Sequence, residues 1–337
     1  MLPLAVSLGD PAGIGPELIA AAWRMRQAER LPPFFVVGGA DILVAAAASG
    51  GHDLPIMRVS GTDGAAAAFA DALPVLELPD AASPAYTPGH PTREGAALAL
   101  SSLTLATRMA LSDAASGLVT GPIAKSLLAE VGFDFPGQTE FLAAACDVEA
   151  EDAVMMLAGP QLRTVPLTVH CALADVPGRL TAELICRRAR ITAAALQRDF
   201  GIDRPRLAVA GLNPHAGEDG KFGDEEARII APAIASLRAE GLEVTGPHPA
   251  DALFTARARP TYDAALCMYH DQALIPLKTL DFDSGVNVTL GLPMIRTSPD
   301  HGTAFDIAGK GVADPGAMIA AIRMAGEMAA RRMPAHR

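Results

Sequence analysis

The sequence has few cysteines and no long apolar run, and its first residues are not expected to form a leader. Its four cysteines are widely spaced, form no CxxC pair and sit in apolar surroundings, which is typical of free thiols in a reducing compartment. No apolar run reaches the ~20 residues that a transmembrane helix needs, so we expect no contact with a membrane. Residues 1–9 lack the basic region and cleavage site of a secretory signal, which favours a cytoplasmic protein.

Positive charge is also scarce. The chain carries 27 Lys and Arg against 38 Asp and Glu, giving a formal net charge of −11 at pH 7. Nucleic acid is therefore not expected as a partner, because no basic field is available to neutralise phosphates. An anionic substrate would need a local cationic pocket set in an acidic surface. With 337 residues, half of them hydrophobic, the chain is globular and long enough for one or two domains.

Short apolar runs alternate with stretches of helical periodicity. Strands are predicted over residues 4–8, 34–37, 75–78, 117–120, 153–157, 162–170, 207–212, 264–268 and 286–290, and helices from residue 16 and over residues 94–111, 181–200, 224–240 and 315–333. This alternation is typical of an α/β fold with a mostly parallel sheet. Residues 159–161 are too short for a helical crossover, so the strands they join should be antiparallel and the sheet mixed. Two α/β lobes with a cleft between them fit this pattern.

Three histidines directly follow apolar runs, namely His170, His215 and His270. Ligands of open α/β sheets collect beyond the carboxyl ends of the strands. Three imidazoles delivered there can bind one divalent cation and leave positions open for a substrate. A single histidine near a strand end is more often a hydrogen-bonded structural residue, so the pattern by itself leaves the metal site and the structural role both open.

Residues suited to an anion follow His270. Lys278 supplies a point charge, Asn287 an amide donor and Arg296 a fork of donors, a combination that suits a phosphate or a carboxylate. The alternative is that both cations are solvated surface charges. The apolar residues just before Arg296 make its full exposure less favourable.

Two glycine-bearing segments complete the pattern. Residues 9–17 (GDPAGIGPE) join a strand to a helix but match neither the P-loop nor the dinucleotide fingerprint. Residues 301–311 (HGTAFDIAGKG) resemble the adenosine-binding loop of isocitrate and isopropylmalate dehydrogenases, and residues 9–17 resemble the N-terminal turn of the same enzymes. With residues 211–218 (GLNPHAGE), 268–272 (MYHDQ) and 289–293 (TLGLP) added, the chain resembles the 4-hydroxythreonine-4-phosphate dehydrogenase family over essentially its full length.

The resemblance implies an isopropylmalate-dehydrogenase-like fold of two α/β/α lobes with a mixed, mostly parallel sheet. One lobe, residues 1–130 plus 298–337, would carry both termini and the cofactor loop. The central lobe, residues 131–297, would carry the metal and substrate residues and the dimer contacts. The implied assembly is a homodimer whose active site is shared between subunits.

The resemblance also assigns residues to roles. His170, His215 and His270 map onto the family's metal ligands, with Zn, Mg, Co or Mn as the cation. The substrate residues are Gln138, Thr139, Lys278, Asn287 and Arg296, and the loop residues expected to bind NAD, or NADP, are His301, Gly302, Thr303 and Asp306. The catalytic base stays open among Lys125, Asp251 and Asp271, each of which can equally be structural.

One substrate position departs from the family pattern. The family usually has Gly-His-Thr-Glu where residues 137–140 read Gly-Gln-Thr-Glu. Gln138 can donate a hydrogen bond, but it cannot carry a proton or a positive charge. The chain therefore either holds the family substrate through a neutral contact or acts on a related compound.

The implied reaction is NAD-dependent oxidation of 4-phosphohydroxy-L-threonine to 2-amino-3-oxo-4-phosphooxybutanoate, which loses CO2 to give 3-amino-2-oxopropyl phosphate. The related alternatives are 4-phosphoerythronate, 4-phosphothreonate and a dihydrodiol dicarboxylate. A metallohydrolase with three histidines would leave residues 301–311 unexplained. A sugar-acid-binding protein would be expected to carry an export signal.

Overall fold

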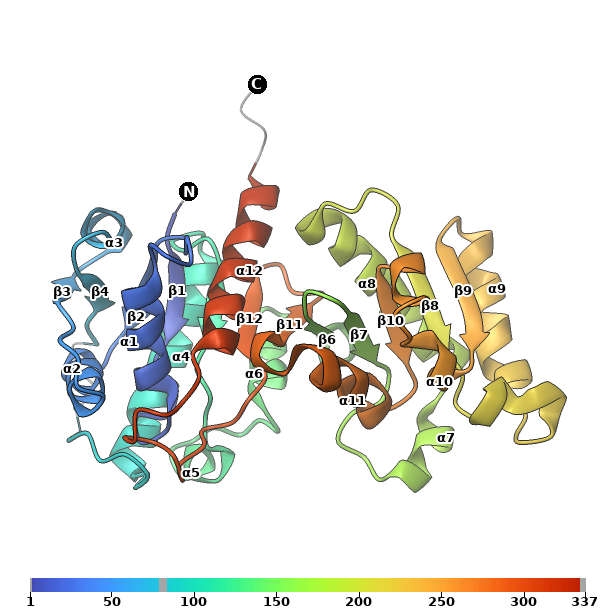
Figure 1. Cartoon of the computed structure of the whole chain (residues 1–337), viewed down its shortest axis with the longest axis horizontal. Coiled ribbons are helices and arrows are strands. Elements are labelled where there is room, and N and C mark those ends of the chain that lie inside the picture. The colour runs from blue at the N-terminus through green and yellow to red at the C-terminus, as the bar shows by residue number, and fades with distance from the viewer. Residues whose placement is uncertain (1, 79–83, 334–337) are drawn as a thin grey trace. The chain divides into compact units, whose positions relative to one another are not determined.

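The computed structural model describes residues 2–78 and 84–333 and divides into two compact units (Figure 1). Unit 1 consists of Met1–Ala150 and Leu292–Arg337, and unit 2 consists of Glu151–Gly291. Both ends of the chain therefore belong to unit 1, and unit 2 is one continuous insertion in it. Within the described residues, no helix combines the length and the apolar character that crossing a membrane requires.

Unit 1 is built on a parallel sheet. Its described strands are β1 (Leu4–Ser7), β2 (Phe34–Val37), β3 (Ile56–Val59), β4 (Leu73–Leu76), β5 (Leu118–Thr120) and β12 (Arg296–Pro299). They lie in the order β3-β4-β2-β1-β5-β12, and each neighbouring pair is parallel. Every residue of β1, β2 and β5 is buried, as expected of central strands covered on both faces.

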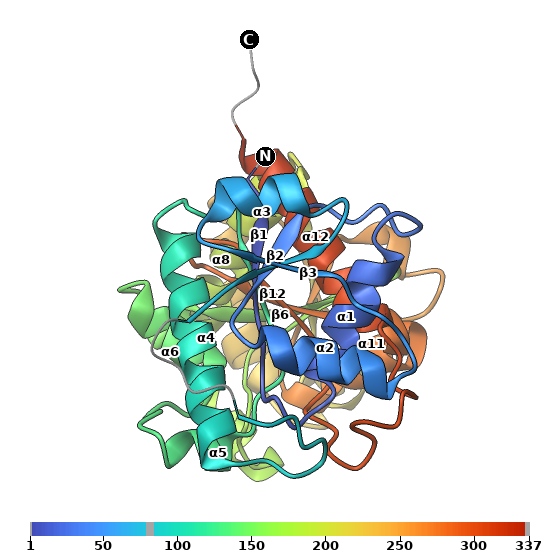
Figure 2. The same cartoon turned by 90° about the vertical axis from the view of Figure 1, so that its left-hand side faces the viewer.

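Helices cover both faces of this sheet. They are α1 (Gly15–Met25), α2 (Ala40–Ser49), α3 (Thr62–Ala68), α4 (Arg93–Leu111), α5 (Lys125–Ala129), α6 (Gln138–Ala145) and α12 (Gly316–Arg332). Figure 2 shows α4 on one face and α1, α2 and α12 on the other. Thr92 caps α4 by accepting a hydrogen bond from Gly95 N, and the buried Leu98 and Ser102, one turn apart, face the sheet, where Ser102 Oγ donates to Val37 O of β2.

Unit 2 contains a mixed sheet. Its described strands are β6 (Val154–Ala158), β7 (Arg163–Pro166), β8 (Arg206–Ala210), β9 (Glu243–His248), β10 (Ala264–Cys267) and β11 (Val286–Leu290), in the order β11-β6-β7-β10-β8-β9. β6 is antiparallel to both β7 and β11, and the other pairs are parallel. The buried Asp281 accepts from Gln161 N (3.0 Å) and so holds the tight β6–β7 turn. The expected mixed, mostly parallel α/β fold is confirmed.

The helices of unit 2 are α7 (Val176–Arg179), α8 (Ala182–Phe200), α9 (Ala231–Ala239), α10 (Ala250–Leu253) and α11 (His270–Asp281), with a π-helical turn (Glu226–Ile230) before α9. α8 packs on α9 and on β6, β8 and β11. α11 packs on β6, β7 and β10, where its Ala273 and Leu277 join a buried cluster with Ala265 and Cys267 of β10. α11 therefore fixes the position of the residues that follow β7 and β10.

The expected lobe boundaries differ from those of the structure. The prediction placed residues 131–150 and 292–297 in the central lobe, whereas they belong to unit 1. The reason is local: residues 138–145 form α6 next to the unit 1 sheet, and Arg296 pairs with Leu118 of β5. Gln138, Thr139 and Arg296 thus lie in unit 1.

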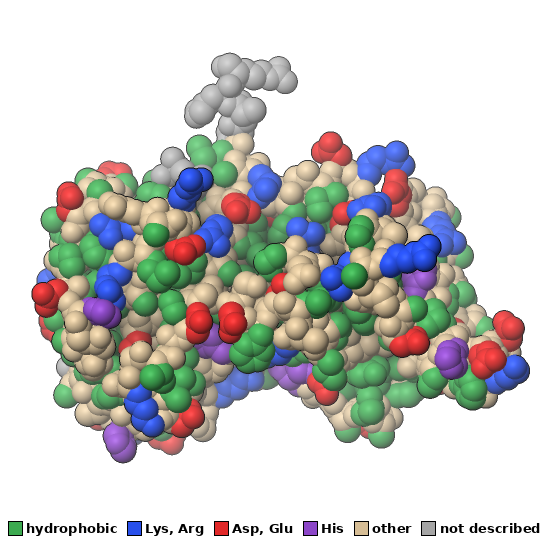
Figure 3. Space-filling view, viewed as in Figure 1, with side chains coloured by type: hydrophobic (Ala, Val, Ile, Leu, Met, Phe, Trp, Pro, Cys, Tyr) green, Lys and Arg blue, Asp and Glu red, His purple; other side chains and the backbone are tan. Residues whose placement is uncertain are grey.

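The surface carries charges of both signs. Figure 3 shows acidic and basic side chains interspersed over the visible face of each unit.

Candidate functional site

Two of the predicted metal-ligating histidines lie side by side in unit 2. β7 and β10 are parallel neighbours, and their association continues beyond the strands because Thr168 Oγ1 donates to Met268 O (2.8 Å). The chain therefore delivers His170 and His270 at the same edge of the sheet, and their ring centroids are 6.1 Å apart. The rule that ligand-binding side chains follow the carboxyl ends of parallel strands explains this juxtaposition.

The His270 ring is oriented by the next residue. His270 Nδ1 lies 2.7 Å from Asp271 Oδ1, so this nitrogen donates to the carboxylate and Nε2 is left as the acceptor that can ligate a cation. A pocket of about 380 Å³ adjoins these side chains and is also lined by Thr168, His170, Cys171, Leu173, Val176 and Tyr269. Two imidazoles, one held by a carboxylate, form a donor set that suits a borderline divalent cation.

His215 is placed differently. It lies in the turn Pro214–Gly220 after β8, and its ring faces Phe222 with the centroids 6.2 Å apart. Across residues 2–78 and 84–333, no three His, Cys, Asp or Glu side chains are grouped closely enough to hold a metal. The structure thus brings His170 and His270 together but does not bring His215 to them within one chain.

The backbone is strained at both histidines that follow β7 and β8. His170 has φ 49° and His215 has φ 53°, and the left-handed region continues through the turn to Asp219. Each non-glycine residue in this region costs roughly 1–2 kcal/mol. Strain of this kind persists where surrounding contacts enforce it, and it is concentrated at functional sites. This observation supports a functional role for both histidines.

A buried carboxylate enforces the conformation of the turn before His215. Glu226 is 5% exposed. Its Oε1 accepts from Leu212 N and Asn213 N, both at 2.8 Å, and its Oε2 accepts from Asn213 Nδ2 at 3.0 Å. A Cβ added at Gly217 would lie 2.7 Å from Oε2, so the turn closes around this carboxylate. The sequence does not reveal a role for Glu226, because that role depends on how the turn Pro214–Gly220 folds back onto its carboxylate.

Unit 1 contains a buried arginine. Arg296, at the start of β12, is 4% exposed, and burial lowers its pKa to about 10. Its Nη2 donates to Thr120 Oγ1 (2.8 Å) and to Gln138 Oε1 (2.9 Å). Both acceptors are neutral and the pKa remains well above 7, so the guanidinium keeps its positive charge for an anion. Thr120, the last residue of β5, was also missed, although it follows the same strand-end rule as the histidines.

The other substrate candidates are distributed over both units. Thr139, half-buried on α6, follows Gln138 in unit 1. In unit 2, Lys278 lies half-buried on α11, and Asn287 lies on β11. The Oδ1 atom of Asn287 is buried and has no hydrogen-bond partner among the described residues. An unsatisfied buried amide oxygen suits a residue that meets a ligand.

The two glycine-bearing segments contact each other. Ile14 N donates to Thr303 O (2.9 Å), and a Cβ at Gly13 would lie 2.8 Å from that same oxygen, so only glycine fits there. Glu17 on α1 accepts from Gly309 N. The N-terminal turn, which the sequence alone left as a weak signal, therefore anchors the loop over residues 301–311.

The candidate cofactor residues within this loop differ in exposure. Thr303 and His301 are half-buried, whereas Gly302 and Asp306 are exposed. His301 Nδ1 lies 3.0 Å from Gly302 O, and its Nε2 is buried with no hydrogen-bond partner among the described residues. A buried ring nitrogen of this kind fits a loop that closes on a bound molecule.

The three candidate bases have different surroundings. Lys125 begins α5, and its Nζ would lie 3.5 Å from a Cβ built on Gly137, directly before Gln138. Asp251 is exposed on the short helix α10. Asp271 is exposed and engaged with His270. Of the three, Lys125 is the one that lies beside the residues around Arg296.

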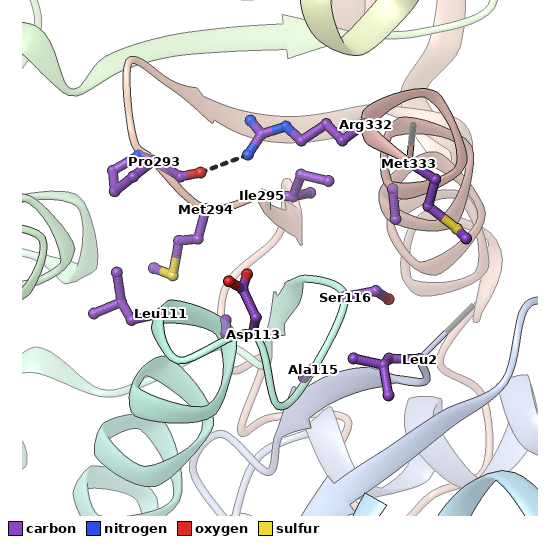
Figure 4. Close-up of a pocket in the computed structure, with 12 residues that line it drawn as sticks. Leu2, Leu111, Asp113, Ala115, Ser116, Pro293, Met294, Ile295, Arg332 and Met333 are labelled. Atoms are coloured by element: carbon purple, nitrogen blue, oxygen red, sulfur yellow. Dashed lines mark hydrogen bonds between the residues drawn. The ribbon is translucent and has the colours of Figure 1, made fainter. Parts of the chain in front are cut away.

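A separate pocket of about 480 Å³ lies at the opposite edge of the unit 1 sheet. It is formed by residues that precede β1, β5 and β12, among them Leu2, Ser116 and Ile295. Figure 4 shows the Asp113 carboxylate directed into it and Arg332 donating to Pro293 O (2.6 Å). None of the candidate site residues lines this pocket.

Known proteins match the chain over almost its whole length. A sequence model described as "Pyridoxal phosphate biosynthetic protein PdxA" matches residues 30–325. The chain is 65% identical to the 4-hydroxythreonine-4-phosphate dehydrogenase of Erythrobacter litoralis over 333 residues, which cover 99% of this chain and 98% of the relative.

Solved structures also resemble the chain in fold and sequence. The crystal structure of 4-hydroxythreonine-4-phosphate dehydrogenase from Klebsiella pneumoniae matches with a TM-score of 0.86 and 39% identity, covering 97% of this chain and 98% of that one. A terephthalate 1,2-cis-dihydrodiol dehydrogenase from Burkholderia xenovorans matches with a TM-score of 0.66 and 30% identity, covering 96% and 97%. The chain therefore belongs to the PdxA family of 4-hydroxythreonine-4-phosphate dehydrogenases, which are oxidoreductases of pyridoxal phosphate biosynthesis.

Proposed function

We propose that the chain oxidises 4-phosphohydroxy-L-threonine with NAD to 2-amino-3-oxo-4-phosphooxybutanoate, which decarboxylates to 3-amino-2-oxopropyl phosphate. The observation that carries the phosphorylated substrate is the buried Arg296, whose Nη2 is held by Thr120 and Gln138. A guanidinium fixed in a buried setting binds a phosphate more strongly than a solvated one, because its desolvation is already complete. This supports a local cationic site on an otherwise acidic protein.

The remaining anchors are Lys278, Asn287 and Thr139. Lys278 would pair with an anionic end of the substrate, and the unsatisfied Asn287 Oδ1 would accept from a substrate hydroxyl or amine. Thr139 would donate its hydroxyl hydrogen to the phosphate. Together these contacts would fix the substrate so that the carbon bearing the alcohol is presented in one orientation.

A divalent cation fits His170 and His270. Their proximity and the Asp271 carboxylate behind His270 support this assignment. When bound there, Zn, Mg, Co or Mn would lower the pKa of the substrate alcohol and stabilise the enolate formed on loss of CO2. We further propose that the chain forms a homodimer and that His215 of one protomer completes the site of the other.

NAD, or NADP, is proposed to bind at residues 301–311. His301, Gly302, Thr303 and Asp306 would contact it, and the buried, unpartnered His301 Nε2 supports this. When bound, the nicotinamide would accept the hydride from the substrate carbon. The proton of the alcohol would leave to a base, for which Lys125 is preferred to Asp251 and Asp271 because of its position beside Gly137.

The test is NADH formation across a substrate panel, each member with and without a chelator. We expect turnover of 4-phosphohydroxythreonine to exceed that of 4-phosphoerythronate, 4-phosphothreonate and a dihydrodiol dicarboxylate, and to disappear with the chelator. The dihydrodiol is included because the Burkholderia xenovorans enzyme, a terephthalate dihydrodiol dehydrogenase by name, shares the fold at 30% identity.

A variant separates metal loss from unfolding. His270→Ala is expected to lose activity together with bound metal, while its thermal unfolding midpoint in the presence of chelator matches that of the unsubstituted protein. Full activity of the chelated protein would refute the metal assignment, and preference for the dihydrodiol would refute the phosphorylated substrate.

A further inference from the structure

Gln138 is held on both sides of its side-chain amide. Nε2 donates to Gly121 O at 3.0 Å, and Oε1 accepts from Arg296 Nη2 at 2.9 Å. Turning the amide over would set its NH₂ against the guanidinium and its oxygen against the carbonyl, so that two hydrogen bonds would become two repulsions. The surroundings therefore fix Oε1 as the atom that faces Arg296.

The backbone that carries Gln138 is also fixed. Three phenylalanines, Phe133, Phe135 and Phe141, contact each other with ring centroids 5.5–5.6 Å apart. Phe133 is buried in a cluster with Leu103 of α4 and Leu128 of α5. Phe133 and Phe141 flank Gln138 in the chain, and their packing in this cluster anchors the start of α6.

Arg296 depends on Gln138 for its orientation. The two hydrogens of Nη2 are committed to Thr120 and Gln138, so an anion must be met by the other nitrogens of the guanidinium. Removing the Gln138 acceptor would leave one Nη2 hydrogen without this partner and would loosen the orientation of the guanidinium. Thr120 and Gln138 together set the plane of the guanidinium and hence the direction in which its N–H groups point at an anion.

We propose that Gln138 is a positioning residue that orients Arg296 as a hydrogen-bond acceptor, rather than a direct ligand of the substrate. The proposal rests on the proposed function insofar as the anion at Arg296 is the phosphate of the substrate. It also interprets the departure from histidine at this position: glutamine accepts from Arg296 at every physiological pH, whereas histidine accepts only while its ring is neutral.

The variant Gln138→His distinguishes the two roles, because they predict opposite changes in anion binding as the pH falls. If the side chain orients Arg296, a neutral imidazole can replace the amide oxygen, and protonation removes the acceptor and adds a like charge. Anion binding then weakens as the pH falls through the histidine pKa. If the side chain contacts the phosphate directly, protonation adds an attractive charge, and binding tightens over the same range.

Other charged groups face this site. Besides Arg296 they are Lys125 of α5 and Glu140 of α6, both close to Gly137, and Asp10 in the turn after β1, whose backbone N donates to Pro122 O next to Gly121. These groups and the substrate phosphate are common to variant and parent. The ratio of the two KM values at each pH therefore isolates residue 138.

We would measure KM and kcat for 4-phosphohydroxythreonine from about pH 5.5 to about pH 8.5, a range that spans the ordinary histidine pKa of about 6.5. Gln138→Ala is expected to raise KM about tenfold or more at all pH values, because it removes a hydrogen bond to a charged group. The change in kcat should be smaller. Gln138→His should have a KM near that of the parent at the alkaline end and about tenfold higher at the acid end. Gln27→His, at an exposed position of unit 1, controls for an added histidine.

The outcomes separate the two proposals. A KM ratio for Gln138→His that falls below one at acid pH would overturn the positioning role and leave the proposed function intact. If the parent protein does not turn over the substrate, the proposed function fails. The positioning role can then still be tested by calorimetric titration with inorganic phosphate, because it predicts that the phosphate affinity of Gln138→His falls as the pH falls. Unchanged phosphate affinity in a folded Gln138→Ala variant would also overturn it.

Discussion

Asp10 is a buried acid whose setting favours its neutral form. It follows β1, is 2% exposed, and accepts from Ala12 N at 3.0 Å. Burial raises its pKa above the ordinary value of 3.8, and the hydrogen bond from Ala12 opposes that shift only in part. The turn over residues 9–17 therefore contains a carboxylate whose ionisation costs folding free energy.

Replacing this acid by its neutral isostere is expected to stabilise the protein near neutral pH. Because the folded pKa is raised, the wild type is favoured below pH 3.8 and loses stability as the pH rises through the folded pKa. Asp10→Asn keeps the acceptor for Ala12 N without a charge, so its advantage should be absent below about pH 3.8 and full at pH 7. Urea unfolding at both pH values measures this. An Asp10→Asn variant less stable than the wild type at pH 7 would refute the account.

Only part of the site was predictable at the residue scale. The strand-end rule predicted that His170 and His270 lie close together, as they do, because it depends on local order along the chain. The left-handed backbone at His170 and His215 was not predictable, since it is imposed by contacts such as those of Glu226, which returns from a later segment. Of the two acceptors around Arg296, Gln138 was named through the family resemblance, whereas Thr120 was missed.

At the scale of elements, the chain leaves β11 through a glycine that no other residue can replace. Gly291 has φ 84°, and a Cβ built on it would lie 1.9 Å from Asp152 O, a backbone atom that cannot move aside cheaply. β11 and the segment before β6 are thereby held closer together than any side chain permits.

We expect Gly291→Ala to destabilise the protein by about 3 kcal/mol or more. This is the sum of the cost of placing an alanine in the left-handed region and the cost of displacing the backbone at Asp152. The midpoint of urea unfolding measures the loss. Gly178→Ala is the matched control, because a Cβ there meets nothing within 4 Å and the residue lies in α7. Equal midpoints for the two variants would contradict the close approach at Gly291.

Elements with strong periodicity were predicted well, and those without it were missed. β11 was predicted at its exact bounds, and α4 and α8 within one residue, because each is apolar at strand or helix spacing. β3 has a partly exposed edge and β9 contains Gly246 and Pro247, so neither shows a strand pattern. β12 reads RTSP and is nevertheless wholly buried, with Thr297 Oγ1 donating to Ala321 O. Its pairing with β5 and its hydrogen bond to α12, rather than hydropathy, define it.

At the scale of the whole molecule, the position of His215 bears on assembly. If His215 of one protomer completes the site of the other, two inactive variants should complement each other. His215→Ala and His270→Ala, refolded together in equal amounts, would form heterodimers in which one of the two sites is intact.

The expected recovery is about a quarter of the wild-type activity, because about half of the dimers are mixed and each has one working site. Activity of the co-refolded mixture, compared with each variant refolded alone, measures this. If all three histidines act within one chain, no recovery occurs, and the shared site is ruled out.

The division of the chain also has a consequence for synthesis. Unit 2 is continuous, so it can acquire its fold on the ribosome as soon as residue 291 has emerged, whereas unit 1 must wait with an unpaired edge at β5 until β12 arrives. Arg296 is the first residue of that late strand. A nascent chain that stops short of β12 therefore contains His170 and His270 but lacks the arginine that we propose to bind the phosphate.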